Sequence, residues 1–259
     1  MLLFFSLDET SHKVPLKRPK KCKTSQDSKP FAIPENHKAD VKAEDDKEDI
    51  IRNIRLRTSP AQLAVVMTSL NHKQRQFVKD IGFGSLLGFS IDSLPGKLVY
   101  YVVDSFDSKE MVIKTSRGDI KCDRQAVHDV FGVPMGPTNI YDLEESSNND
   151  LENEWLGQWN IGKKVRPANI ASMFNNDYEI SEMFKINILM LFVSTMVESD
   201  SNGYIKLDLL KRLPKNSDLR SFDWCGFLLK SLASSKDNWN RDFPDKNPYS
   251  GPATFLSVS

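Results

Sequence analysis

An almost uninterrupted apolar stretch between Ser181 and Ser199 limits the folds open to this chain more than any other segment. A helix that is apolar around nearly its whole circumference must be buried on several sides. The longest apolar part, residues 183–197, is shorter than the roughly 20 residues that a bilayer-spanning helix needs, and it contains four polar side chains: Lys185, Asn187, Ser194 and Thr195. We therefore predict the central helix of a folded domain and no membrane span.

Helical periodicity and end signals predict further helices on both sides of this segment. Their expected starts are Ser59 as N-cap with Pro60 at the first helical position, Asn71, Pro95, Asp123, Pro167, Leu207 and Ser221. Gly82 and Gly84 should end the second helix, and Gly132 with Pro134 the helix after Asp123. The composition of residues 94–106 also favours a strand, but Pro95 near the start of this segment favours a helix, and we predict a helix.

The last strong helix should turn six side chains inward: Trp224, Cys225, Phe227, Leu228, Leu229 and Leu232. Residues 111–122 predict a short β-hairpin with its turn at 116–119, and residues 144–150 have loop composition. After the last helix we expect a loop, then an apolar segment at Phe255 and Leu256 that the C-terminus cuts short. The predicted fold class is mainly α: a compact multi-helix domain with one short β-hairpin.

The first 57 residues have a different composition from the rest of the chain. From Ser11 to about Arg57 the sequence is polar, punctuated by proline and without helical or strand periodicity, which predicts a disordered charged arm over residues 1–57 preceding a domain at 58–259. The arm carries a basic cluster, Lys17, Arg18, Lys20 and Lys21, before an acidic block at 40–49. An import receptor can bind exposed lysines and an arginine as a nuclear-import motif. The alternative is a solvated tail that no receptor binds.

Overall charge and cysteine usage exclude several classes of protein. Lys plus Arg equals Asp plus Glu at 35 each, so the whole molecule has no strong attraction to nucleic acid or an anionic membrane. The three cysteines, Cys22, Cys122 and Cys225, lie far apart in the sequence, which favours free thiols in a reducing compartment. The apolar residues 1–7 lack a preceding cationic segment and are interrupted by Asp8 and Glu9, so no secretion signal is expected.

No catalytic or metal-binding constellation emerges from the sequence. A cysteine nucleophile needs a histidine beside it, and the four histidines, His12, His37, His72 and His128, show no pairing with a cysteine that favours catalysis over inert packing. Closely spaced Cys or His ligands, a phosphate loop and a distinctive cofactor lysine are missing as well. The glycines at 82, 84 and 88 indicate a turn, and the four tryptophans, Trp155, Trp159, Trp224 and Trp239, indicate core packing. We expect no enzyme activity and no cofactor.

Four stretches in this order resemble a family of plant proteins. They are residues 82–95, residues 120–136, residues 184–205 and the run Phe222-Asp223-Trp224-Cys225. Together they resemble the plant mobile domain, also called aminotransferase-like, and the non-catalytic N-terminal region of transposon-associated plant proteins, some of which carry a C-terminal SUMO-type cysteine protease domain. The resemblance covers about residues 57–259, and its motifs are structural. It implies no catalytic residue here, because the protease His, Asp and Cys belong to a domain that follows this region.

The resemblance and the basic arm lead to one hypothesis and two alternatives. The leading hypothesis is a non-enzymatic, transposon-derived interaction module that works in the nucleus, or otherwise in the cytoplasm, with protein partners. The first alternative is the partner- or substrate-binding N-terminal part of a SUMO-type protease. The second is a nucleic-acid-binding module, whose affinity would be weak and salt-sensitive because only about six charges contribute.

Overall fold

The apolar segment forms the centre of the domain, as predicted. Helix α7 (Glu182–Phe192) continues into a π-helical turn, η3 (Val193–Val197), and every residue from Phe184 to Val197 is buried. Helices α1 and α6 pack on α7, while α9 and α10 pack on η3. The buried polar groups of this segment find partners: the Thr195 hydroxyl donates to the Leu191 carbonyl oxygen at 2.6 Å, and Lys185 pairs with Glu182 at 2.7 Å. These bonds offset the cost of burying polar atoms.

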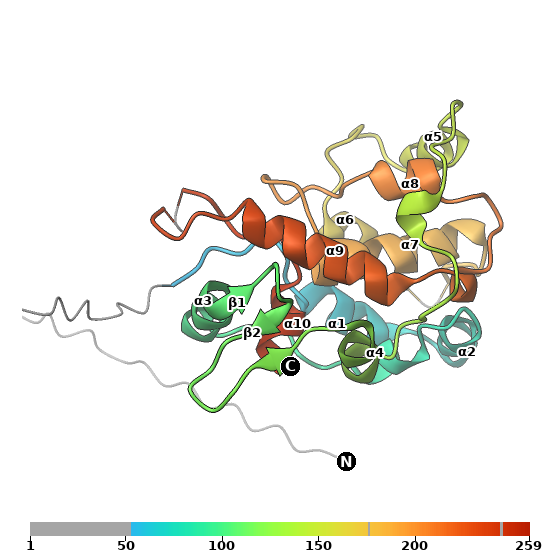
Figure 1. Cartoon of the computed structure of the whole chain (residues 1–259). Helices are drawn as coiled ribbons and strands as arrows, with labels where there is room; N and C mark the ends of the chain where they lie inside the picture. Colours follow the sequence, from blue (N-terminus) through green and yellow to red (C-terminus); the bar gives the residue numbers. More distant parts are fainter. Residues whose placement is uncertain (1–52, 176, 244–245) are drawn as a thin grey trace, which may run out of the picture. The chain divides into compact units, whose positions relative to one another are not determined.

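The computed structural model describes residues 53–259 except 176, 244 and 245, and Figure 1 shows the arrangement of their helices and strands. The predicted disordered arm lies outside the described residues up to position 52. The α-helices are α1 (Ala61–Ser69), α2 (His72–Asp80), α3 (Gly96–Ser105), α4 (Arg124–Phe131), α5 (Asp150–Leu156), α6 (Pro167–Ala171), α7, α8 (Asp208–Arg212), α9 (Trp224–Asp237) and α10 (Ala253–Val258). Short 3-10 turns are η1 (Gly84–Gly88), η2 (Ile140–Asp142) and η4 (Leu219–Ser221). The mainly helical fold class is therefore confirmed.

Local capping signals explain where several helices begin and end. Asn71 accepts from the Gln74 amide, and the Gln74 side chain accepts from the Asn71 amide, both at 3.0 Å, which makes a capping box at α2. Asp123 caps α4 by accepting from Ala126 at 2.9 Å, and Gly132 ends that helix with a positive φ of 61°. At α1 the structure corrects the prediction by one residue, because Pro60 is already helical in its dihedral angles and takes the N-cap position instead of Ser59.

The predicted hairpin belongs to a three-stranded antiparallel sheet. Strands β2 (Val112–Ile113) and β3 (Ile120–Lys121) form the hairpin, and β1 (Phe106–Asp107), directly after α3, pairs with the other side of β2. The first strand escaped prediction because the helical interpretation of residues 94–106 included Phe106, the first residue of β1. The turn is closed by the Gly118 amide donating to the Thr115 carbonyl oxygen at 3.2 Å.

Three further details differ from the sequence-based expectations. Residues 150–156 form helix α5, which the polar composition of the preceding loop concealed. The last long helix begins at Trp224, because Asp223 caps it and residues 219–221 form a separate turn. Phe255 and Leu256 are buried within helix α10, which packs against α3.

Residues just before the predicted domain boundary at 58 also pack into the domain. The Tyr249 amide donates to the Arg55 carbonyl oxygen at 2.9 Å, and the Arg57 amide donates back to Tyr249 at the same distance. Ile54 is buried. Within the described part of the chain, every helix is too short or too polar to cross a bilayer.

Candidate functional site

The end of α4 and the start of α9 are held together by a short stretch of backbone pairing. The Gly136 amide donates to the Phe222 carbonyl oxygen at 2.9 Å, and the Asp223 amide donates to Thr138 at 2.8 Å. A β-bridge also pairs Met135 with Asp223. These bonds set the distance between the two helices, which form two walls of the site described next.

Gly136 makes this close approach possible. A Cβ atom at this position would overlap the backbone carbonyl of Ser221 and crowd the Phe222 amide. Backbone atoms cannot rotate out of the way as a side chain can, so only glycine fits here without moving one segment.

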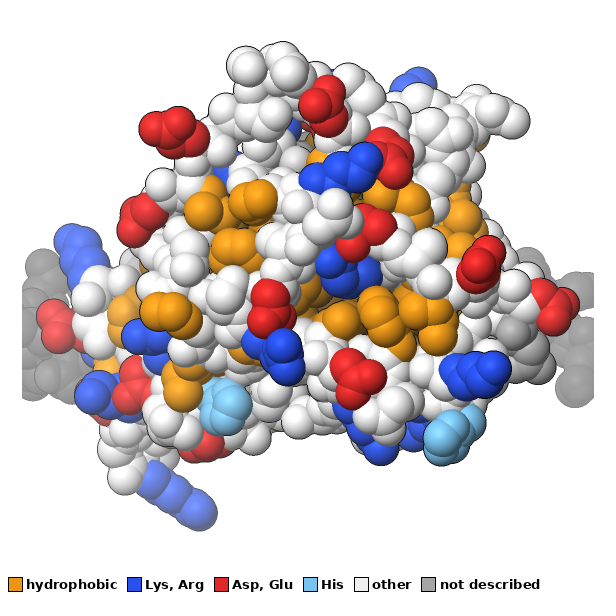
Figure 2. Space-filling model, turned by 90° about the vertical axis from the view of Figure 1, so that its right-hand side faces the viewer, with side chains coloured by type: hydrophobic (Ala, Val, Ile, Leu, Met, Phe, Trp, Pro, Cys, Tyr) orange, Lys and Arg blue, Asp and Glu red, His pale blue; other side chains and the backbone are white. Residues whose placement is uncertain are grey.

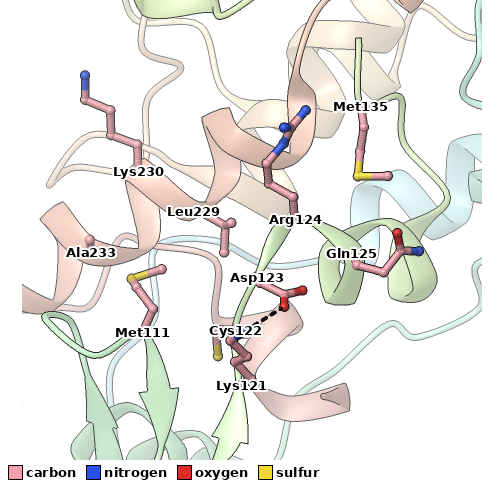
Figure 3. A pocket seen from close by; sticks show the side chains of 10 residues that line it. All are labelled: Met111, Lys121, Cys122, Asp123, Arg124, Gln125, Met135, Leu229, Lys230 and Ala233. Atoms are coloured by element: carbon pink, nitrogen blue, oxygen red, sulfur yellow. Dashed lines mark ion pairs between the residues drawn. The ribbon is translucent and has the colours of Figure 1, made fainter. Parts of the chain in front are cut away.

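A solvent-facing groove of about 810 Å³ lies between α9, the β3–α4 junction and the segments that precede β2 and follow α4. Figure 3 shows Leu229 projecting from α9 into the middle of the groove, with Met111 on the sheet side and Met135 across from it. Ala233 and Cys122 complete the apolar lining. Leu229 is only half-buried: it packs against the edge of the core, in line with the prediction, and the rest of its side chain lines the groove, whereas Leu228 is fully buried.

Met111 has an unusual backbone conformation for its residue type. Its φ is 53°, in the left-handed region where a side chain costs roughly 1–2 kcal/mol. Its carbonyl oxygen accepts from the Cys122 amide at 2.8 Å, and this bond joins the residue before β2 to the residue after β3. Strained residues of this kind concentrate at functional sites, and here the strain accompanies a flexible apolar side chain at the edge of the groove.

Charged side chains surround the apolar floor. Arg124 Nε lies 3.0 Å from Asp223 Oδ2, while Lys121 Nζ lies 3.7 Å from Asp123 Oδ2. The Lys230 ammonium lies 3.7 Å from the centre of the Tyr141 ring, a cation–π contact at the outer edge. The groove thus combines an apolar interior with a predominantly basic rim.

The two described cysteines are not assembled for catalysis. Burial, aided by nearby Asp123, raises the pKa of Cys122 to about 11, and burial with Asp223 raises that of Cys225 to about 12, so both thiols stay protonated near neutral pH. His128 Nδ1 donates to the Val133 carbonyl oxygen at 2.8 Å, and Cys225 Sγ donates to the same oxygen at 3.6 Å. The imidazole and the thiol therefore share an acceptor, and neither activates the other.

Other parts of the described structure give weaker candidates. A hollow of about 420 Å³ beside Tyr141 holds charges that neutralise one another, with Arg212 on Glu145 at 2.6 Å and Lys206 on Glu198 at 2.8 Å. Among the residues that the structure describes, no group of three or more His, Cys, Asp or Glu side chains is placed to hold a metal ion. Trp155 and Trp224 are fully buried, so they offer no exposed faces for stacking bases.

The predicted import motif, Lys17, Arg18, Lys20 and Lys21, lies outside the described residues, as do Cys22, His12 and His37. His72 is the exposed first residue of α2, and Gly82 forms a turn with a φ of 90°. Sequence reasoning did not find the groove. Its lining comes from four separate segments, and the sequence of each segment gives no signal that they meet.

Comparison with known proteins gives one match. The profile of a family described as "Domain of unknown function (DUF8566)" matches residues 56–257. No curated protein shows a significant similarity to the chain, and neither does any solved structure.

Proposed function

Because the chain belongs to the DUF8566 family, whose description names no activity, we propose its function from the groove: the domain is a non-enzymatic module that binds a partner protein. The proposal rests on the apolar floor of the groove. The two described cysteines, Cys122 and Cys225, stay protonated, so neither supplies a nucleophile there. A volume of about 810 Å³ is enough for several side chains of a docked segment. Methionines adapt to different partner shapes, which suits protein binding better than a fixed reaction geometry.

The charge distribution supports a protein partner over nucleic acid. On the face in Figure 2, Lys and Arg side chains are interspersed with Asp and Glu, and apolar patches lie between them. Nucleic-acid binding of useful strength draws on many phosphate contacts from a continuous basic surface. That face does not offer such a surface.

A nuclear, transposon-derived role is the finer part of this proposal. It rests on the basic cluster at Lys17, Arg18, Lys20 and Lys21 and on the resemblance to plant mobile domains, and an import receptor would be the reader of that cluster. A fluorescent fusion tests it. Nuclear accumulation should be lost when the four residues become alanine, and a fusion that is cytoplasmic before and after this change would refute it.

The binding function is tested by affinity purification of the intact chain from its own tissue, followed by mass spectrometry. Leu229→Asp places a charge in the groove and should remove the specific partner. The matched control is Val65→Asp, which changes a residue of α1 that is 59% exposed and does not line the groove. A partner retained by the control and lost by the groove variant supports the proposal, whereas a partner set unchanged by Leu229→Asp contradicts it.

A further inference from the structure

The rim of the groove has an excess of positive charge. Its lining residues include three cations, Lys121, Arg124 and Lys230, and one carboxylate, Asp123; because Asp223 pairs with Arg124, the formal excess is one positive charge. The whole chain is formally neutral, so this excess is a property of the site. Such a local field favours partners with the opposite charge.

The three cations differ in how available they are to a partner. Arg124 is held by Asp223, which is only 15% exposed in its side chain and also accepts from the Gly226 amide at 2.9 Å. Lys121 has a long contact of 3.7 Å with Asp123, and both side chains are well exposed, so this pair contributes little. Lys230 has no carboxylate partner among the described residues and rests on the Tyr141 ring.

The position of Lys230 suits capture of a carboxylate. Figure 3 shows Lys230 extending from α9 away from the groove floor, on the opposite side of Leu229 from Lys121, and Lys230 also borders the hollow that holds Glu145 and Glu198. A bound segment that places an apolar side chain against Leu229 therefore has a cation on each side. The Tyr141 contact limits the conformational entropy that Lys230 would lose on binding.

From these features, and resting on the proposed binding function, we infer that the groove binds an acidic amphipathic segment of a partner protein. Its apolar side chains contact Met111, Met135 and Leu229, and its carboxylates pair with Lys230 and Lys121. Arg124 remains with Asp223 and supports the wall of the groove. The inference concerns the chemistry of the partner, which the proposed function leaves open.

Two labelled peptides test this partner chemistry against the full-length chain. Both have about 16 residues, long enough to form a helix, and carry the same Leu and Phe face. One has Glu on its other positions and the other has Lys. Fluorescence anisotropy should show the Glu peptide binding at least about tenfold more tightly, with a difference that shrinks as salt is raised.

Variants assign the effect to named side chains. Lys230→Met keeps the aliphatic stem and removes the charge, and it should weaken the Glu peptide about fivefold while leaving the Lys peptide unchanged or slightly tighter. Lys230→Glu, which replaces the positive charge with a negative one, should reduce the preference for the Glu peptide further than Lys230→Met does. Val65→Asp should change neither affinity, and Leu229→Asp should abolish binding of the Glu peptide.

The outcomes separate the inference from the function on which it rests. Equal affinity for both peptides, or no effect of Lys230→Glu, overturns the acidic partner; if Leu229→Asp still abolishes binding, the groove remains a binding site. Peptide binding that survives Leu229→Asp overturns both proposals. Absence of binding by either peptide overturns the acidic partner alone, because the groove is tested independently by the tissue purification.

Discussion

Arg124 Nε lies 3.0 Å from Asp223 Oδ2, and this ion pair joins the first turn of α4 to the residue that caps α9. Asp223 also accepts from the Gly226 amide at 2.9 Å, so one carboxylate both caps α9 and holds Arg124 of α4. The groove exists because these two helix starts lie side by side with the hairpin next to them.

Asp223→Ala should lower the free energy of unfolding by about 1–2 kcal/mol, because it removes the helix cap together with the ion pair. Asp223→Asn is the matched control. An asparagine caps nearly as well, so it should cost only about 0.5 kcal/mol, the value of a half-exposed ion pair. Urea unfolding monitored by circular dichroism measures both. Equal losses in the two variants would mean that the charge, and not the cap, dominates.

Neighbouring leucines on α9 should differ sharply in their effect on stability. Leu228 is fully buried, so Leu228→Ala should cost about 2–5 kcal/mol, whereas Leu229 faces the groove and Leu229→Ala should cost about 1 kcal/mol or less. Denaturant unfolding checks the stability of each variant, and peptide anisotropy checks binding. The result would contradict the structure if Leu229→Ala were the more destabilising change.

The contrast between these leucines shows where sequence reasoning reaches its limit. Capping by Asp123 and termination by Gly132 depend on chemistry within a few residues, and both were predicted. The central helix was predicted because a helix that is apolar around nearly its whole circumference must be buried inside a folded domain. In all three cases the signal and the structure lie in the same short segment.

The groove could not be predicted in this way, because it depends on how separate segments meet. Met111, Met135 and Leu229 are far apart in sequence, and the apolar character of Leu229 suits a core and a groove equally well. Only the tertiary position of α9, set by the pairing of residues 134–138 with residues 221–224, decides between them. The three-stranded sheet was half predicted for another reason: both strand pairs are local, but the helical interpretation of residues 94–106 included Phe106, the first residue of β1.

Met111→Gly should separate folding from binding. Glycine relieves a left-handed conformation worth roughly 1–2 kcal/mol, which offsets the lost contacts of a half-buried methionine, so the net change in unfolding free energy should stay within about 1 kcal/mol. Affinity for the acidic peptide should fall several-fold because part of the groove floor is gone. Met111→Leu is the control, since it keeps the apolar side chain and the strain. Unchanged affinity in the glycine variant would remove Met111 from the binding surface.

Asn187 should be essential to the core next to α7. Its Oδ1 accepts from Trp155 Nε1 at 2.7 Å, and its Nδ2 donates to Tyr178 Oη at 2.6 Å and to Gln158 Oε1 at 2.9 Å. Asn187→Leu leaves the buried indole N–H without an acceptor and should cost about 3 kcal/mol. Gln158→Ala removes one hydrogen-bond partner of Asn187 at the half-buried edge of this network and should cost about 1 kcal/mol. Thermal and urea unfolding test the ordering, and a neutral Asn187→Leu would contradict this network.

The described thiols should be unreactive in the folded chain. In a Cys22→Ser background only Cys122 and Cys225 remain, and their raised pKa values of about 11 and 12 keep both protonated. A thiol-specific reagent at pH 7.5 should therefore label the native protein slowly and the urea-unfolded protein rapidly. Because the folded pKa values exceed the ordinary value of 9.0, the unfolded state ionises first as pH rises. The stability that these groups contribute is complete below about pH 9 and is lost as pH rises from 9 to about 12, which alkaline unfolding curves can follow. Rapid labelling of the native chain at pH 7.5 would show an activated thiol, and it would reopen the case for cysteine chemistry at the base of the groove.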